Sequence, residues 1–178
     1  MSDLTGKRVA IIATDHVEES ELVEPRDALR AAGAEVRVHS TSTEPIQGVR
    51  SDTEQTQQLE VDATFADLDP AAYDALVVPG GTVNADTIRT DEQAQAIVRA
   101  FAASGKPLAV ICHGPWLLIS AGLVAGRRLT SYPSIADDVR NAGGTWLDEE
   151  VVIDEHLITS RSPADLPAFV TALEDALA

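Results

Sequence analysis

Apolar positions along the chain follow two alternating periods. Short apolar or alternating runs of strand length recur between longer segments in which apolar residues return every three or four positions. The strand-like segments are residues 7–14, 34–40, 74–81 and 106–112. The helix-like segments are residues 18–33, 90–105 and 166–178. This alternation of strands and helices predicts an α/β fold, with a mainly parallel sheet covered by helices on both faces.

Local signals place the ends of two helices and one interruption. Gly33 is expected to end the first helix as a C-cap, and Ser162 and Pro163 to form the N-cap and first residue of the last. Residues 41–68 break the alternation and are expected to form an irregular hairpin at an edge or interface. With no repeat or linker in sight, residues 1–178 are predicted to form one domain.

Composition narrows the class of function. The 13 basic and 29 acidic residues give a formal charge of −16, which disfavours binding to nucleic acid or an anionic membrane. The same acidic, lysine-poor composition fits either a halophilic source or a GC-rich genome. No apolar run is long enough to cross a bilayer and the N-terminus lacks a signal-peptide pattern, so a cytoplasmic location is expected.

The only cysteine, Cys112, lies where a predicted strand meets a predicted helix. A strand, a sharp turn and a helix form a nucleophile elbow, in which the helix N-terminus favours a thiolate. Gly114 allows the tight turn and Pro115 suits the first helical turn. The alternative is a buried structural cysteine. A single cysteine excludes an internal disulfide and a multi-cysteine zinc site, and we expect no metal or cofactor.

Two other strand ends carry residues that could assist the thiol, because sites in open α/β sheets gather at the carboxyl ends of strands. Gly81 and His113 could each present a backbone N–H and form an oxyanion hole, although Gly81 could equally belong to a plain glycine turn. Glu18 opens the first helix and could approach Cys112. The alternative is a solvated glutamate stabilised by the helix dipole, which is what Glu19 and Glu21 are expected to be; the residues alone do not choose among the three.

Several motifs together resemble one known family. The segments are "VEESEL", "DALVVPGG", "AVICHGPWLLISAG", "GRRLTSYPSIADDVRNAGGTW" and "SRSPADLPAF". They are similar to the PfpI-type intracellular proteases, whose superfamily includes the parkinsonism-associated redox protein and the class I glutamine amidotransferases. The likeness runs nearly end to end. It implies a flavodoxin-like three-layer sandwich and a homodimer, or a hexamer built as a trimer of dimers.

The resemblance also implies roles for individual residues. It places the nucleophile on Cys112, its histidine on His113, and the carboxyl group that hydrogen-bonds the thiol on Glu18. The histidine is completed by an acidic residue of a neighbouring subunit, which falls on Asp86; this chain has one extra residue in that loop. The elbow must bend Cys112 and His113 together, since neighbours on a helix point about 100° apart. Otherwise His113 serves mainly through its backbone N–H.

Three functions are consistent with these residues. The first is a cysteine hydrolase acting on peptides, on methylglyoxal or on early methylglyoxal adducts, through attack of the thiolate on a carbonyl carbon. The second is a redox-sensing stress protein in which Cys112 is oxidised to sulfinic acid. The third is an oligomeric binding protein with a vestigial site. If a protonated Glu18 donates to the sulfur, the pKa of Cys112 should fall below its free value of ~8.5.

Overall fold

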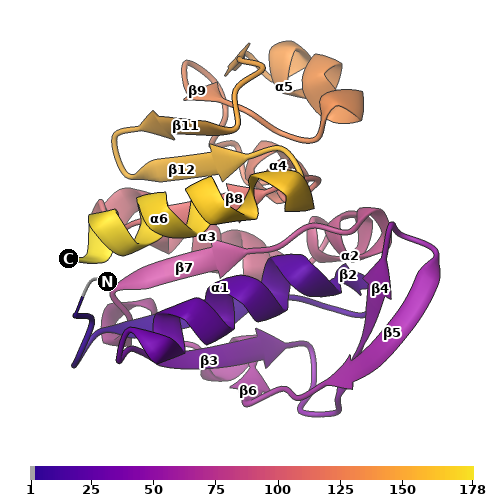
Figure 1. The fold of residues 1–178 in the computed structure, drawn as a ribbon. Helices are drawn as coiled ribbons and strands as arrows, with labels where there is room; N and C mark the ends of the chain where they lie inside the picture. Colours follow the sequence, from indigo (N-terminus) through magenta and orange to yellow (C-terminus); the bar gives the residue numbers. More distant parts are fainter. Residues whose placement is uncertain (1–2) are drawn as a thin grey trace.

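The computed structural model describes residues 3–178, in which one mixed sheet is covered by helices on both sides (Figure 1). The order of its strands is β11-β12-β8-β7-β1-β3-β6. Their bounds are Val151–Asp154 (β11), Leu157–Ser160 (β12), Leu108–Ile111 (β8), Ala75–Val78 (β7), Arg8–Ile12 (β1), Glu35–Ser40 (β3) and Ala63–Thr64 (β6). Every neighbouring pair is parallel except β11 with β12. The predicted α/β class is confirmed.

The two faces of the sheet are covered by different helices. One face carries α1 and α6, which contact each other, and the other carries α3 and α4. The helix bounds are Glu19–Ala31 (α1), Thr82–Ile88 (α2), Glu92–Ser104 (α3), Pro115–Ser120 (α4), Ala136–Asn141 (α5) and Leu166–Leu177 (α6). Alternate residues of β1 enter opposite cores: Val9 and Ile11 on the α1 side, Ala10 and Ile12 on the α3 side. Burial on both faces explains why this strand is continuously apolar.

The interruption at residues 41–68 contains a hairpin, as predicted. Strands β4 (Ile46–Arg50) and β5 (Glu54–Leu59) pair in antiparallel fashion with a shift of register between Gln47 and Val49. Together with β2 (Val17–Glu18) they form a second, three-stranded sheet. The hairpin therefore lies beside the carboxyl end of β1, where β2 follows. A two-stranded sheet joins β9 (Arg128–Leu129) to β10 (Thr145–Trp146).

The helix ends agree with the sequence in one place and differ in another. After α1, Gly33 adopts the left-handed conformation with φ of 99°, as expected of a C-terminal glycine. Ser162 instead precedes a short 3₁₀ turn, Pro163–Asp165, and its side chain makes no capping bond. Helix α6 begins only at Leu166. None of the helices within residues 3–178 is long and apolar enough to cross a membrane.

Candidate active site

The elbow expected at Cys112 is present in the backbone. The residue follows the end of β8 and adopts a left-handed conformation, with φ of 63°. Such a conformation is strained for a residue other than glycine and clusters at functional sites. Two hydrogen bonds hold it: its N–H donates to the carbonyl of Ser160 at 3.0 Å, and its carbonyl accepts from the N–H of Tyr132 at 2.8 Å. The thiol-bearing residue is only 6% exposed.

The turn brings the side chains of Cys112 and His113 together. Their Sγ and Nδ1 atoms lie 3.3 Å apart, in contact range for proton transfer. On a regular helix, adjacent residues would diverge, so the left-handed turn accounts for this pairing. His113 therefore offers more than its backbone N–H. Burial lowers the pKa of His113, which keeps the imidazole neutral and able to accept a proton.

Two aromatic side chains pack against the imidazole of His113. The ring of Tyr132 stacks on it with centroids 4.8 Å apart and an angle of 24°, and Trp116 of α4 meets it edge-on at 5.3 Å. Its Nε2 atom lies 3.4 Å from the hydroxyl oxygens of both Thr82 and Ser134. The orientation of the ring is thus set from several sides, and within residues 3–178 the hydrogen-bonding partners of Nε2 are these two hydroxyl groups.

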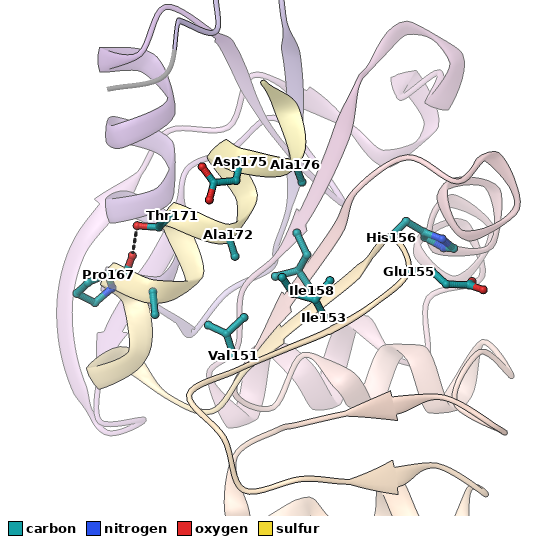
Figure 2. Close-up of a pocket in the computed structure, with 11 residues that line it drawn as sticks. Val151, Ile153, Glu155, His156, Ile158, Pro167, Thr171, Ala172, Asp175 and Ala176 are labelled. Carbon is teal, nitrogen blue, oxygen red and sulfur yellow. Dashed lines mark hydrogen bonds between the residues drawn. The ribbon is translucent and has the colours of Figure 1, made fainter.

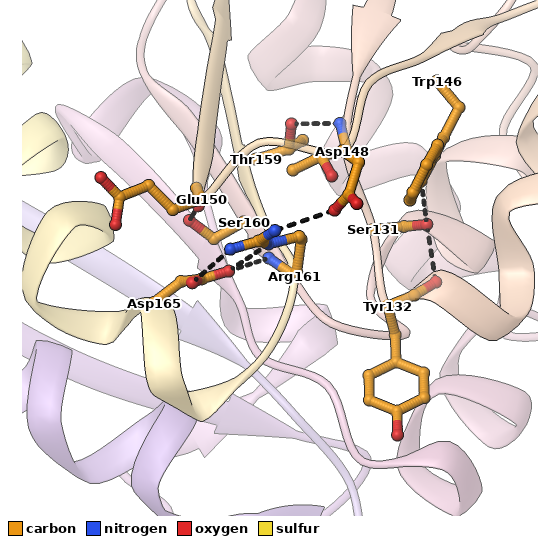
Figure 3. A network of polar contacts seen from close by, with 10 residues as sticks. Ser131, Tyr132, Trp146, Asp148, Glu150, Thr159, Ser160, Arg161 and Asp165 are labelled. Carbon is orange, nitrogen blue, oxygen red and sulfur yellow. Dashed lines mark hydrogen bonds and ion pairs between the residues drawn. The ribbon is translucent and has the colours of Figure 1, made fainter.

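The segment that carries Tyr132 is tied down by a polar network (Figure 3). The Trp146 indole N–H donates to Ser131 Oγ at 2.9 Å, and that hydroxyl donates to the carbonyl of Tyr132 at 3.0 Å. In the same network Arg161 binds Asp165 through two nitrogens, at 2.8 and 3.0 Å. From the sequence these residues were notable only as family motifs; the structure shows that Ser131 and Trp146 hold the segment that places Tyr132 against His113.

Glu21 is the carboxyl group beside the thiol. It is fully buried, and its Oε2 accepts a hydrogen bond from the N–H of Gly80 at 2.7 Å. The side chain also lies in hydrogen-bonding range of Cys112. The expectation that Glu21 is solvated was wrong, because the α1 face that carries it packs onto the sheet. Burial raises the pKa of Glu21 to about 8.

Glu18 occupies a neighbouring position with a different set of contacts. It precedes α1 and is 7% exposed, and its carboxyl accepts hydrogen bonds from the N–H groups of Ser51 and Asp52 in the β4–β5 turn. Burial raises its pKa. We therefore correct the assignment made from the resemblance: Glu21, one helical turn later, adjoins the thiol, while Glu18 secures the turn. The available signal in the sequence was the spacing of three residues, which places Glu21 in the first turn of the helix that Glu18 precedes.

The surroundings of the sulfur correct a second expectation. Burial raises the pKa of the Cys112 thiol, and an ionised Glu21 would raise it further by repulsion. The backbone N–H groups of Gly81 and His113 both point to the sulfur and lower the pKa of the thiol. The predicted fall in pKa was wrong, because the sequence pattern did not show how deeply the elbow is buried. The resting site holds a thiol with a neutral base beside it.

The glycine pair after β7 allows this close packing. A Cβ atom on Gly80 would lie 2.6 Å from Cys112 Cβ and 2.7 Å from Glu21 Oε2. Gly81 has φ of 84°, and a Cβ there would lie 2.5 Å from the carbonyl of His16. Both positions exclude a side chain, and Gly81 can present its N–H to the sulfur as a result.

The thiol opens into a small pocket of about 190 Å³. Its lining residues are Glu18, Glu21, Ser51, Asp52, Cys112, His113, Tyr132 and Pro163. Three of them are carboxyl groups, and none is lysine or arginine. Asp86 is exposed on α2 and is not among them. Among residues 3–178, no group of three or more His, Cys, Asp or Glu side chains is arranged to hold a metal ion.

A larger apolar groove of about 680 Å³ lies elsewhere, between α6 and the β11–β12 hairpin (Figure 2). Val151, Ile153 and Ile158 contribute apolar side chains from the strands, and Ala172 and Ala176 from the helix. It contains neither Cys112 nor His113. Size alone would select this groove, whereas the strained backbone of the buried elbow makes the pocket at Cys112 the candidate site.

Known proteins share both this sequence and this fold. The chain is 42% identical over 166 residues to protein/nucleic acid deglycase 2 of Escherichia coli, covering 92% of this chain and 94% of that protein. It is 44% identical to a deglycase of Pyrococcus abyssi, with 92% and 95% covered. The structure of Drosophila melanogaster DJ-1beta matches with a TM-score of 0.88 and 29% identity, over 100% of this chain and 91% of that one. The model of the DJ-1/PfpI family matches residues 7–176. The fold and the family predicted from the sequence are thus confirmed, and the chain belongs to the DJ-1/PfpI family.

Proposed function

We propose that this protein is a cysteine-dependent hydrolase of the deglycase type, acting on methylglyoxal and its early adducts in protection against carbonyl stress. The observation that carries the proposal is the position of the Cys112 sulfur. It lies 3.3 Å from a neutral imidazole nitrogen of His113 and beside the buried carboxyl of Glu21, inside a small pocket. Relatives that are 40–44% identical are named deglycases, and one that is 40% identical is a general stress protein of Bacillus subtilis.

The residues have complementary roles in addition of the thiol to a carbonyl. As the sulfur forms a bond to the carbonyl carbon, its proton passes to Nδ1 of His113 and the π electrons move to the carbonyl oxygen. The N–H groups of Gly81 and His113 converge on the sulfur and can stabilise the developing oxyanion. Because the thiol is not ionised beforehand, proton removal must accompany attack.

Glu21 is suited to the later proton transfers. With a pKa of about 8, its carboxyl exchanges a proton readily near neutral pH, as a general acid–base group should. Addition of water to methylglyoxal gives lactate by an internal oxidation and reduction, without an external oxidant. When methylglyoxal is bound to an amine, the same reaction releases the free amine.

The dimensions of the pocket favour a small carbonyl compound over a peptide. A space of about 190 Å³ accommodates methylglyoxal or the tip of a modified side chain, but not an extended peptide backbone. One relative, 35% identical, is named a putative cysteine protease. The enclosure of Cys112 supports deglycation as the principal activity here.

Oligomer formation belongs to the same proposal. We expect a homodimer, or a hexamer of three dimers, in which Asp86 of one subunit supports His113 of another. Asp86 is exposed on α2, so its side chain is available to a second subunit.

The proposal is tested by measuring consumption of methylglyoxal and release of amine from methylglyoxal-modified arginine. Wild type should be active, while Cys112→Ala and wild type alkylated with iodoacetamide should be inactive. Activity that survives complete alkylation would overturn the role of Cys112. Formation of a sulfinic acid under mild peroxide, in a protein with no turnover of either substrate, would favour the redox-sensor alternative.

A further inference from the structure

The β4–β5 turn reaches across to the start of α2 through Asp52. Its Oδ1 accepts a hydrogen bond from the backbone N–H of Thr82 at 2.7 Å, and its Oδ2 accepts one from the Thr82 hydroxyl at 2.8 Å. The same hydroxyl oxygen lies 3.4 Å from Nε2 of His113. Asp52, Thr82 and His113 therefore form a continuous chain of contacts that ends at the Cys112 sulfur.

The number of available protons decides which group donates and which accepts in each of these hydrogen bonds. A threonine hydroxyl has one proton, and a carboxylate has none to give. The proton of Thr82 is used in the bond to Asp52, so toward His113 the Thr82 oxygen can only accept. A hydrogen bond between Nε2 and Thr82 therefore requires the proton on Nε2, and Nδ1 then presents a lone pair to the sulfur 3.3 Å away. Ser134, the other neighbour of Nε2, can accept or donate and does not decide the tautomer.

We propose that Asp52 is a positioning residue, which acts through Thr82 to hold His113 in the tautomer that can accept the thiol proton. All of its contacts arise within one subunit, unlike those expected of Asp86. This inference deepens the proposed function, but it concerns the protonation of His113 and can be examined without turnover.

The turn is built to keep Asp52 in this place. Both Ser51 and Asp52 have left-handed backbones, with φ of 51° and 63°, which serine in particular rarely adopts. Their N–H groups are held by the carboxyl of Glu18. The strain of the turn is thus offset by the buried carboxyl acceptor of Glu18, and the side chain of Asp52 is held toward Thr82.

The groups that face His113 are few. Asp52 raises the pKa of the imidazole, opposing the effect of burial. The other ionisable groups lining the pocket are Glu18, Glu21, Cys112 and Tyr132. A change at Asp52 should therefore alter both the tautomer of His113 and its titration.

The most informative variant is Asp52→Asn. Its amide oxygen can still accept from the Thr82 N–H, while its NH₂ group would donate to the Thr82 hydroxyl oxygen. The Thr82 proton would then be free to point at Nε2, which favours the tautomer with the proton on Nδ1. Thr82→Val removes the relay, Thr82→Ser restores it, and Thr87→Val, at an exposed position of the same helix, is the matched control.

Nitrogen-15 chemical shifts of His113 and the rate of Cys112 alkylation against pH provide the two measurements. Wild type, Thr82→Ser and Thr87→Val should show protonated Nε2 and equal alkylation rates. Asp52→Asn and Thr82→Val should shift the proton toward Nδ1 and slow alkylation at neutral pH by roughly 10-fold or more, a partial loss of a general-base contribution that is typically ~10²–10⁴-fold. Protonated Nδ1 in wild type, or an unchanged tautomer in both Asp52→Asn and Thr82→Val, would overturn the proposal. If the tautomer of His113 behaves as expected but neither wild type nor any variant turns over methylglyoxal adducts, the proposed function fails while the inference about Asp52 stands.

Discussion

Glu21 Oε2 accepts a hydrogen bond from the N–H of Gly80 at 2.7 Å, and this contact joins the first helix to the turn after β7. It fixes a fully buried carboxyl beside the Cys112 sulfur. The other oxygen, Oε1, is buried and has no hydrogen-bond partner among residues 3–178. A carboxyl that is half satisfied in this way is easier to bury protonated than ionised.

Glu21→Gln should change how stability depends on pH. Since the pKa of Glu21 is raised in the folded protein, its contribution to stability is complete below its ordinary value of 4.5 and is lost as pH rises through about 8. Glutamine does not titrate, so Glu21→Gln does not lose stability in this way. Between pH 4.5 and about 8, the unfolding free energy of wild type should therefore fall relative to that of the variant, by roughly 5 kcal/mol at most. Urea unfolding at several pH values measures it. Glu24→Gln, at an exposed position of α1, is the control; a difference between Glu21→Gln and wild type that stays constant with pH would contradict the assignment.

The same substitution should lower the pKa of Cys112. Glutamine has the same shape but no charge, so the repulsion that an ionised Glu21 exerts on the thiolate disappears. Thiolate absorbance in the ultraviolet, followed against pH, gives the value directly. An equal or higher pKa in Glu21→Gln than in wild type would show that Glu21 acts on the sulfur mainly as a hydrogen-bond donor.

Glu18→Ala should loosen the β4–β5 turn and leave the immediate surroundings of the sulfur intact. The N–H groups of Ser51 and Asp52 would lose their acceptor, at a cost of roughly 1–3 kcal/mol in unfolding free energy. Alkylation of Cys112 should slow because Asp52 is no longer held toward Thr82. The comparison is with Glu21→Ala: a larger shift of the Cys112 pKa in Glu18→Ala than in Glu21→Ala would restore Glu18 as the partner of the thiol.

Gly80→Ala should damage both the fold and the site. The new methyl group would lie 2.6 Å from Cys112 Cβ, so the elbow or Glu21 must move. Overpacking of this kind costs typically ~1–3 kcal/mol. Thermal unfolding and alkylation rate are the measurements, with Gly105→Ala as a control for a glycine whose added Cβ would meet nothing within 4 Å. Gly80→Ala with the stability and reactivity of wild type would show that the turn can relax.

Asp86 can be tested by complementation between subunits. If it supports His113 of another subunit, Asp86→Asn and Cys112→Ala should each be impaired alone. A mixed dimer has one site with an intact thiol from the first variant and an intact Asp86 from the second. Activity should therefore return on mixing and subunit exchange. Impaired Asp86→Asn that is not rescued by mixing would place the effect within one subunit.

The sequence by itself determined the fold class, four strands of the central sheet, three of its helices and the position of the candidate nucleophile. Strand-length apolar runs and helical periodicity predicted the sheet and its covering helices, because burial of apolar side chains follows the geometry of each element. The junction at Cys112 could be recognised in the sequence because an apolar strand, a glycine-proline turn and a helical period follow one another there. Motif spacing was sufficient to identify the family.

Only the tertiary structure decided which side chains surround the sulfur. Glu18 immediately precedes α1 and Glu21 lies in its first turn, and the choice between them depends on how α1 sits against the turn at Gly80. Asp52 comes from a hairpin whose pairing gave no clear pattern, and it reaches Thr82 across 30 residues of sequence. The thiol pKa follows from burial, which is a property of the packed site. Local patterns specify local geometry, whereas contacts between distant segments are set by packing of the whole chain.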